Sequence, residues 1–352
     1  MKKLFGVLLV VVCFTALSLS CKKKNAEADV ALLINGTLGD RSFHDSANNG
    51  MKLVSEKLGL KTKVVEVGYD TSKWGPALRD LCDEKYEIIV CGTWQMQEIV
   101  QRVVNEYPKQ KFIIYDASVD YANDTKGLYK NVYSIEYKQN EGSYLAGALA
   151  ASMSKTSVVG FVGAMDNTVI RDFLVGYVQG AKDTNSGIKV LSSFIGSFSD
   201  TAKAKELTFA QYQMDADIVF SVAANAGEGS LQAAKEKNKY AIGVDSDQGM
   251  LYLQSDPALA KLILSSMLKR VDESILLAVT EAQNGTLAWG TRALFGIEEN
   301  CVGLAENEIY DEVVPQNVRE LIKVDMQKIQ NGEVNVATAF GMSDDAFNEL
   351  IK

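Results

Sequence analysis

The sequence has very few of the side chains on which metal sites and disulfide frameworks depend. Its 352 residues include one histidine, His44, and five cysteines. One histidine excludes an HExxH zinc site and any centre with two histidine ligands. The cysteines beyond residue 21 (Cys82, Cys91 and Cys301) are odd in number and show no CxxC spacing. Neither a disulfide framework nor a zinc site is indicated, at most one pair could bridge, and no metal or cofactor is expected.

Several catalytic and phosphate-binding motifs are also missing. Neither GxxxxGK[ST] nor GxGxxG occurs, so a phosphorylated ligand would lack a glycine-rich cradle, and GxSxG is absent too. Spacing alone leaves one nucleophile pair open, Cys91 with His44. No third group is evident to orient the histidine, and a thiol in an apolar run is usually inert. We therefore predict a protein that is not an enzyme and assign no catalytic residue.

Basic charge is in short supply. The chain carries 45 acidic and 36 basic side chains, and two of the basic ones stand at its very start. Without them the net charge is about −11 by simple counting. Nucleic acid is an unexpected partner, because affinity for phosphate backbones needs a basic face.

A long apolar run occurs only at the N-terminus. Residues 4–19 follow two lysines and stop at Cys21, the layout of an export signal. We interpret residues 1–20 as a signal peptide, Cys21 as the lipidated residue and residues 21–29 as a polar tether. The pattern before the cysteine departs from a full lipobox, so simple secretion or a retained signal anchor stays open. The prediction is a lipid-anchored protein of the cell membrane that faces the periplasm or the cell surface.

Short Val/Ile-rich runs alternate with helical patterns through the rest of the chain. The runs lie at residues 30–34, 63–67, 87–90, 111–115 and 132–135, and again at 158–162, 189–194, 217–222 and 240–244. This alternation predicts βαβ units, in which helices cover a parallel sheet. Two rounds of it in about 320 residues predict an α/β protein with two doubly wound parallel-sheet lobes joined by a hinge.

The C-terminal third is expected to cross between the lobes more than once. A long helix is predicted from Ser265 to about residue 283, with Asn284-Gly285 as its stop. An extended run and two short helices follow. We place lobe 1 at residues 30–137 plus about 263–290, and lobe 2 at residues 138–262 plus about 291–352.

Chemistry-bearing residues gather where predicted strands end. Ligands of open parallel sheets bind at the carboxyl ends of the strands. The residues found there are Asn35, Phe43, His44, Trp94 and Asp116 in the first half, and Phe198, Asn225 and Asp245 in the second, with Lys269 in the first turn of the long helix. Ser42 to Asp45 fits a capping box, which would hold Phe43 and His44 on the opening turn of a helix.

Each of these residues also has an ordinary structural explanation. Core packing suits Phe43, a cap or turn suits Asp116 and Asp245, and a surface or capping role suits His44. Their convergence favours a pocket for a flat, uncharged, hydroxylated ligand. Phe43 and Phe198 would stack on its ring, worth about 1 kcal/mol each beyond area burial. Asp245 would accept from hydroxyls, and Lys269 would donate to an oxygen.

Four segments carry a resemblance to a known family. They are Ile34-Asn-Gly-Thr-Leu-Gly-Asp-Arg-Ser-Phe43, Gln139-Asn-Glu-Gly-Ser-Tyr-Leu-Ala-Gly147, Gly243-Val-Asp-Ser-Asp-Gln248 and Ser266-Met-Leu-Lys-Arg270. In order and spacing they resemble the basic membrane protein (Bmp) family of lipoproteins, closest to its purine-nucleoside receptor branch. The resemblance covers residues 30 to about 350.

The resemblance implies a type I periplasmic-binding-protein fold that closes on a nucleoside and passes it to an ABC-type permease. It implies that Phe43 and Phe198 sandwich the purine, and that Asp116 bonds its edge. Asp245 and Lys269 would hold the ribose, and Gly227 would offer a backbone contact to the sugar. The family usually has aspartate in place of Asn35 and asparagine in place of His44. Both positions flank the base, so the base preference is left open.

The function predicted from the sequence is a monomeric, lipid-anchored solute-binding protein for nucleosides, with purine nucleosides such as adenosine, guanosine or inosine favoured. Three alternatives stay open. A surface adhesin would use the same fold without a ligand, and a sugar-binding relative would take ribose or galactose without a base. An enzyme that splits the glycosidic bond would release free base from adenosine or inosine.

Overall fold

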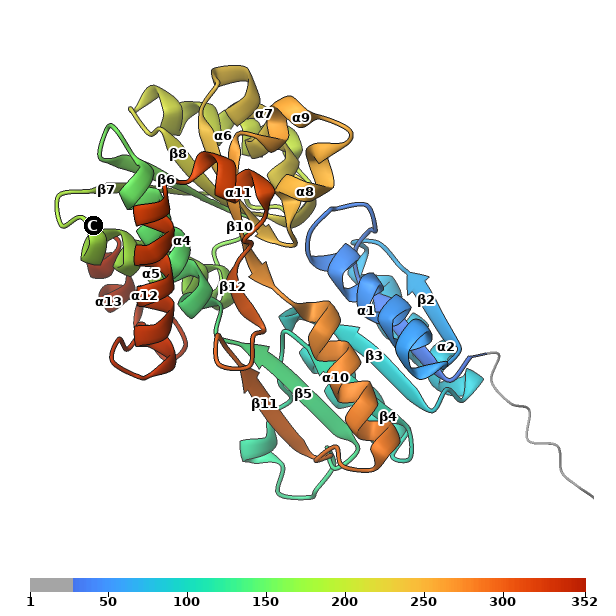
Figure 1. The fold of residues 1–352 in the computed structure, drawn as a ribbon. Coiled ribbons are helices and arrows are strands. Elements are labelled where there is room, and N and C mark those ends of the chain that lie inside the picture. The colour runs from blue at the N-terminus through green and yellow to red at the C-terminus, as the bar shows by residue number, and fades with distance from the viewer. Residues whose placement is uncertain (1–27) are drawn as a thin grey trace, which may run out of the picture.

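A computed structural model describes residues 28–352, which form two α/β lobes (Figure 1). The predicted signal peptide, lipidation at Cys21 and most of the tether lie outside these residues. None of the helices in the described part of the chain has the length and apolar character that a membrane span requires.

The first lobe is built on a six-stranded parallel sheet. Across the sheet the strands are β2 (Thr62–Glu66), β1 (Val30–Ile34), β3 (Ile88–Gly92), β4 (Lys111–Tyr115), β5 (Val132–Tyr137) and β11 (Thr291–Phe295). The helices are α1 (Phe43–Leu58), α2 (Thr71–Glu84), α3 (Gln97–Glu106) and α10 (Val271–Asn284), with short 3-10 turns η1 (Trp94–Met96) and η2 (Tyr121–Asn123). Leu32 and Ile34 share a core with α1 and α10, whereas Ala31 and Leu33 share one with α2 and α3. The sheet is therefore covered on both faces, as its continuous apolar strands require.

The second lobe repeats this plan. Its strands are β7 (Lys189–Phe194), β6 (Val158–Gly163), β8 (Ile218–Val222), β9 (Tyr240–Asp245), β10 (Ile263–Lys269) and the antiparallel β12 (Val302–Leu304). The helices are α4 (Gln139–Met153), α5 (Thr168–Thr184), α6 (Thr201–Gln213), α7 (Gly227–Lys237), α8 (Gln248–Leu253), α9 (Pro257–Ala260), α11 (Glu308–Val313), α12 (Gln316–Gln330) and α13 (Asp344–Leu350), with a 3-10 turn η3 (Ala224–Ala226). The predicted pair of doubly wound lobes is confirmed.

Two segments lie in the opposite lobe from the one predicted. The helix expected from Ser265 begins only at Val271, because residues Ile263–Lys269 form β10 beside β9 in the second sheet. β11 pairs with β5 in the first sheet, although residues 291–352 were assigned to lobe 2. An apolar strand buried on both faces carries no period-2 pattern, so its apolar residues continued the stripe of the following helix.

Three connections within the described chain join the lobes, between β5 and α4, between β10 and α10, and between β11 and β12. They lie side by side: Lys138 N donates to Phe295 O at 2.8 Å, and Arg270 N donates to Cys301 O at 2.8 Å. This bundle of short crossings is the hinge. Lobe movements about it change the space between the carboxyl ends of the two sheets.

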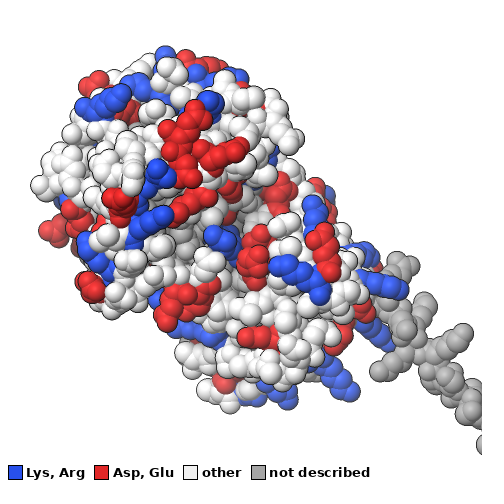
Figure 2. Space-filling model, in the orientation of Figure 1, with Lys and Arg blue, Asp and Glu red and all other residues white. Residues whose placement is uncertain are grey.

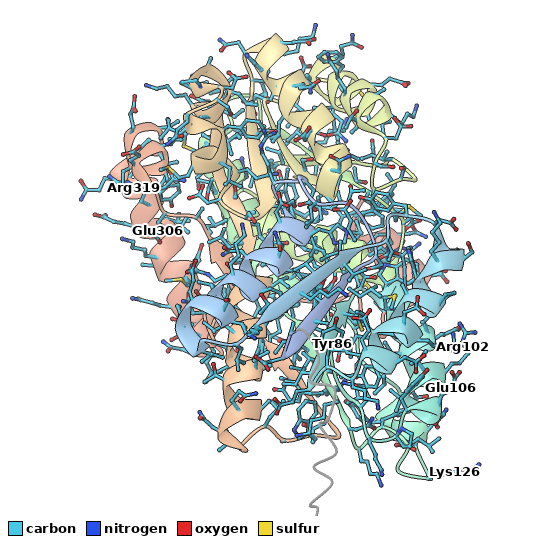
Figure 3. The ribbon with its side chains drawn as sticks, turned by 90° about the vertical axis from the view of Figure 1, so that its right-hand side faces the viewer. Tyr86, Arg102, Glu106, Lys126, Glu306 and Arg319 are labelled. Atoms are coloured by element: carbon cyan, nitrogen blue, oxygen red, sulfur yellow. The ribbon has the colours of Figure 1, made fainter. Side chains whose placement is uncertain are left out.

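Charges of both signs are interspersed on the face shown in Figure 2, without a continuous basic patch. Figure 3 shows the molecule from the side, with Arg102 and Glu106 of α3 pointing outward from the first lobe.

Candidate functional site

A cavity of about 630 Å³, including the open space at its mouth, lies between the lobes at the carboxyl ends of strands from both sheets. Of the residues predicted from the sequence, Asn35, Phe43, His44, Trp94, Asp116, Phe198, Asp245 and Lys269 line it. Asn225 and Gly227 do not, since they belong to η3 and to the start of α7 just behind the lining.

The two lobes each contribute an aromatic residue to the lining. Phe43 opens α1 and is 9% exposed, with its ring centroid 5.6 Å from that of Tyr115. Phe198 lies in the loop between β7 and α6 and accepts a backbone hydrogen bond from Ala226 at 2.9 Å. A ring bound in the cavity therefore meets an aromatic side chain from either lobe.

Lys269 joins the lobes electrostatically. It is the last residue of β10, 1% exposed, and its ammonium forms an ion pair with Asp116, which follows β4 in the other lobe. The ammonium also lies 5.0 Å from the ring centroid of Tyr137, 5.3 Å from Phe173 and 5.6 Å from Phe43. Aromatic faces and one carboxylate together offset the cost of burying the cation. The prediction that Lys269 begins the long helix is wrong, but the residue reaches the cavity from the strand end instead.

Backbone strain marks the same strand ends in both lobes. Thr93 after β3 and Asp116 after β4 have φ of 75° and 57°, and Ala224 after β8 and Asp245 at the end of β9 have φ of 45° and 65°. Left-handed φ at residues other than glycine costs about 1 kcal/mol or more each. All four residues line the cavity, so the strain falls where side chains are turned toward one site.

Asp245 is buried and holds a hydrogen bond across the cleft. Its Oδ2 accepts from the hydroxyl of Ser42 at 2.5 Å. Burial raises the pKa of Asp245 to about 7, although Lys269 and the Ser42 bond both favour its charged form. Burial also raises the pKa of Asp116, again against the pull of Lys269. Burial makes the ionised form of both carboxyl groups unfavourable. A ligand that donates hydrogen bonds to them would offset this cost.

His44 is 5% exposed and its Nδ1 has no partner. Its ring packs against Gly36, where an added Cβ would lie 2.1 Å from Nε2. Burial lowers the pKa of His44 despite the nearby Asp40, so the ring is neutral at pH 7. A neutral imidazole can donate or accept according to its tautomer.

The predicted capping box at the start of α1 is wrong. Ser42 makes no side-chain cap, because its hydroxyl is committed to Asp245. The buried Asp40 takes over, accepting from the backbone N–H of Ser42, His44 and Asp45 at 3.0, 2.9 and 3.1 Å. Asp45 accepts from Gly39 and Arg41 instead of reaching back to Ser42. The loop that presents Phe43 and His44 is thus held from within by two carboxylates.

The remaining predicted groups have clear positions. Asn35 is 2% exposed; its Nδ2 donates to the hydroxyl of Thr93 at 2.7 Å while its Oδ1 has no partner. Trp94 is 41% exposed at the rim. Cys91 is fully buried, and burial raises its pKa, which argues against a thiolate nucleophile. Among residues 28–352 no cluster of three metal-ligating side chains occurs, and Cys82, Cys91 and Cys301 are free thiols.

Several lining residues of the second lobe were not predicted from the sequence. Asn167 caps α5 at the end of the short loop that follows β6, a position at which the strand-end rule could have found it. Val169, Ile170 and Phe173 follow on the first turns of that helix. Their apolar side chains add to the hydrophobic part of the lining.

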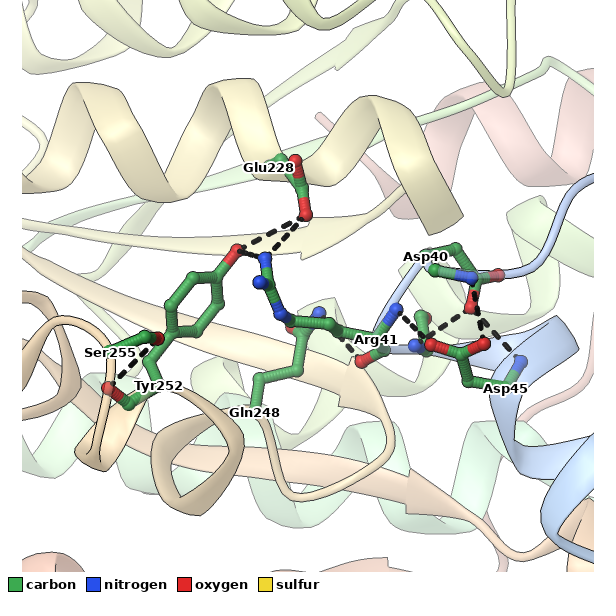
Figure 4. Close-up of polar contacts among 9 residues, drawn as sticks. Asp40, Arg41, Asp45, Glu228, Gln248, Tyr252 and Ser255 are labelled. Atoms are coloured by element: carbon green, nitrogen blue, oxygen red, sulfur yellow. Dashed lines mark hydrogen bonds and ion pairs between the residues drawn. The ribbon is translucent and has the colours of Figure 1, made fainter.

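A set of contacts beside the cavity ties the lobes together (Figure 4). Arg41 of the first lobe pairs with Glu228 in the first turn of α7 at 2.9 Å and lies 4.7 Å from the ring centroid of Tyr252 in α8. Gln248 Nε2 donates to Arg41 O at 3.2 Å, and Ser246 Oγ donates to Ser42 O at 3.0 Å. We call these residues, 41–42 with 228, 246, 248 and 252, the clasp. Its contacts join the two lobes directly.

Comparisons with known proteins agree with this architecture. The Bmp family model, described as ABC transporter substrate-binding protein PnrA-like, matches residues 28–337. Basic membrane protein A of Borreliella afzelii is 30% identical over 325 residues, which are 90% of this chain and 95% of the relative. The ABC transporter nucleoside-binding protein BmpA of Lactococcus lactis subsp. cremoris is 30% identical over 308 residues, which are 83% and 86% of the two chains. A solved ABC transporter solute-binding protein of Aeropyrum pernix K1 has a TM-score of 0.78 at 24% identity and covers 91% of this chain and 95% of its own. The likeness confirms the predicted type I periplasmic-binding-protein fold.

Proposed function

The chain belongs to the Bmp family of PnrA-like ABC transporter substrate-binding proteins, and from that premise we propose that it binds a nucleoside, preferably a purine nucleoside, between its lobes. The observation that carries the proposal is one cavity lined by an aromatic residue from each lobe, Phe43 and Phe198, together with the buried Asp245 and Lys269 and the largely buried Asp116. The two phenylalanine rings could stack on a flat base, and the two carboxylates and the ammonium could form hydrogen bonds with ribose hydroxyls.

The pairing of Asp116 with Lys269 refines the assignment of roles. The resemblance gave Asp116 to the edge of the base, but its carboxylate is bonded to the ammonium that faces the ribose in the same scheme. We therefore assign Asp116, Asp245 and Lys269 together to the ribose. Asn35 and His44, whose unpaired buried atoms lie in the same lining, are left for the base.

Binding on this proposal is a closure of two lobes without covalent chemistry. The open lobes admit the nucleoside, and closure brings Phe198 and Asp245 against a ligand already resting on Phe43. The closed protein would be held at the cell membrane by lipid on Cys21, facing the periplasm or the cell surface, and would deliver the nucleoside to an ABC-type permease. The adhesin, the sugar-binding protein and the glycosidic-bond-splitting enzyme are the competing outcomes of the test.

A thermal-shift screen of the purified protein tests the proposal. A ligand that binds only the folded state stabilises it by about 2.7 kcal/mol at a hundredfold excess over Kd. We expect adenosine, guanosine or inosine to raise the Tm by several degrees, with free bases and ribose giving less. No shift with any of them would favour the adhesin, and a shift with ribose or galactose alone would favour the sugar-binding protein. Release of free base from adenosine or inosine would indicate the enzyme.

A further inference from the structure

Asn167 presents a hydrogen-bond donor that nothing in the protein uses. Its Oδ1 accepts from the backbone N–H of Ile170 at 3.1 Å and so caps α5. Its Nδ2 is buried and has no hydrogen-bond partner. The residue belongs to the lining that the second lobe contributes to the cavity, as do Val169 and Phe198.

The cap fixes which way the amide points. Exchanging its oxygen and nitrogen would set an NH₂ group against the N–H of Ile170, and two donors cannot pair. The group left over is therefore a donor, whatever the ligand. A donor buried among apolar neighbours without a partner costs about as much as a lost hydrogen bond, so this arrangement is unfavourable until something in the cavity accepts.

We propose that Asn167 is a specificity-determining residue that donates from Nδ2 to an acceptor of the bound base, either a ring nitrogen or an exocyclic oxygen. This inference rests on the proposed function, because it assumes a nucleoside in the cavity. The first lobe supplies the complement: Oδ1 of Asn35 and Nδ1 of His44 are buried, unpartnered and part of the same lining. The base is then held by hydrogen bonds from both lobes as well as by two aromatic rings.

The ligand class follows from this inventory. A site that commits a buried donor rejects ligands without a matching acceptor far more strongly than an apolar pocket does. Nucleosides whose base carries an acceptor next to a donor satisfy both Asn167 and Asn35, and purines with a 6-amino or a 6-oxo group do so. A free sugar leaves the donor of Asn167 unused unless a hydroxyl reaches it.

The two roles of Asn167 can be separated by mutation, because a substitution can keep the cap of α5 and still remove the Nδ2 donor. Asn167→Ser retains an N-cap oxygen for Ile170 and removes the NH₂ group, whereas Asn167→Ala removes both. The Tm of ligand-free Asn167→Ser should stay close to that of the wild type, and Asn167→Ala should be lower. With the purine nucleoside that the wild type binds most tightly, we expect Asn167→Ser to lose about tenfold in affinity by calorimetry.

Base analogues identify the acceptor. Each analogue lacks one acceptor of the base. Either a ring nitrogen is replaced by C–H, or the 6-oxo oxygen is replaced by hydrogen. One analogue should bind the wild type more weakly than the parent nucleoside does. Asn167→Ser should bind this analogue and the parent nucleoside equally well, because the analogue and the substitution each remove the same hydrogen bond. Equal affinity of wild type and Asn167→Ser for the parent nucleoside would overturn the inference and leave the proposed function intact. An analogue series that loses affinity equally in both proteins would also overturn it. A wild type that binds no nucleoside would instead refute the proposed function.

Discussion

At the scale of single residues, Asp245 combines a role in the site with a cost to the fold. Its pKa is raised to about 7 by burial, well above that of an unfolded aspartate. The folded protein therefore holds a proton that the unfolded chain releases above about pH 4. The contribution of this group to stability is fully present below that pH and is lost as pH rises through about 7.

Asp245→Asn should accordingly make the ligand-free protein more stable at pH 8, on the order of 1 kcal/mol, and change its stability little at pH 4. The amide oxygen can still accept from Ser42, so the contact across the cleft survives. Nucleoside affinity should fall about tenfold or more, because a charged acceptor is replaced by a neutral one. Thermal melts of both proteins from pH 4 to 8, with and without nucleoside, measure both effects. Parallel melting curves against pH would contradict the assignment of the raised pKa.

The effect of His44 on stability depends on pH in the opposite direction from that of Asp245. Burial lowers its pKa below 6.5, so on acidification the unfolded chain takes up a proton before the folded protein does. The wild type should therefore lose stability relative to His44→Asn as pH falls below about 6.5, while the two differ little in pH dependence between pH 7 and 8. Because protonation of His44 alters the hydrogen bonds that its ring can offer, binding should also change with pH, and this change should fall below about pH 6.5. If His44→Asn leaves affinity and the ranking of bases unaltered, the residue only supports the start of α1.

At the scale of elements, α4 and α5 approach each other backbone to backbone. A Cβ added to Gly176 would lie 2.1 Å from Asn140 O, and one added to Gly180 would lie 2.0 Å from Tyr144 O. Gly176→Ala should destabilise the protein by about 1–3 kcal/mol through overpacking, although alanine is the better helix former by about 1 kcal/mol. Gly187→Ala is the matched control, since its Cβ would meet only the Asn185 side chain at 3.5 Å. Urea melts of the two variants should differ clearly; equal midpoints would show that the helices shift apart at little cost.

The elements that could be predicted from the sequence are those whose pattern is local. The runs at 30–34 and 111–115 coincide with β1 and β4, because apolar residues between turn signals define a buried strand. β10 was predicted as helix, since Arg270 before α10 gives no side-chain cap. The acidic pair Asp272 and Glu273 in the first turn of α10 does mark the start, and the prediction did not use it. The pairing of β11 with β5 depends on a crossing between lobes, which no local pattern records.

The same distinction holds for the site. The strand-end rule located Asp116 and Asp245 because their positions follow from strand ends alone. The rule could not predict that the hydroxyl of Ser42 donates to Asp245 instead of capping α1, since this hydrogen bond joins residues 203 apart in the chain. Nor could it show that the cap of α5 would leave one atom of Asn167 unpaired, which requires the coordinates of both groups.

At the scale of the whole molecule, the two rims of the cleft differ. The clasp bonds the lobes on one rim through Arg41, Glu228 and Tyr252. Another part of the cleft, lined among others by Trp94 and the exposed Phe340, opens as a groove that shares Trp94 and Asp116 with the cavity. On the proposed function, a nucleoside would enter through this groove, and the clasp would stabilise the state in which the lobes are closed on it.

Arg41→Ala should therefore weaken binding without touching the ligand. The Arg41 and Glu228 side chains are 40% and 24% exposed, so their ion pair is worth at most about 1 kcal/mol, and the contact with Tyr252 adds about as much. We expect affinity to fall about three- to tenfold, mainly through faster release, because only the closed state contains these contacts. Arg79→Ala is the control: it removes a similarly exposed ion pair to Glu106, 2.6 Å long, that lies within the first lobe. Stopped-flow fluorescence of Trp94 measures release in both variants. Equal release rates for wild type and Arg41→Ala would mean that the hinge and the ligand alone hold the lobes closed. Slower release from Arg79→Ala than from Arg41→Ala would show that the clasp helps to hold them closed.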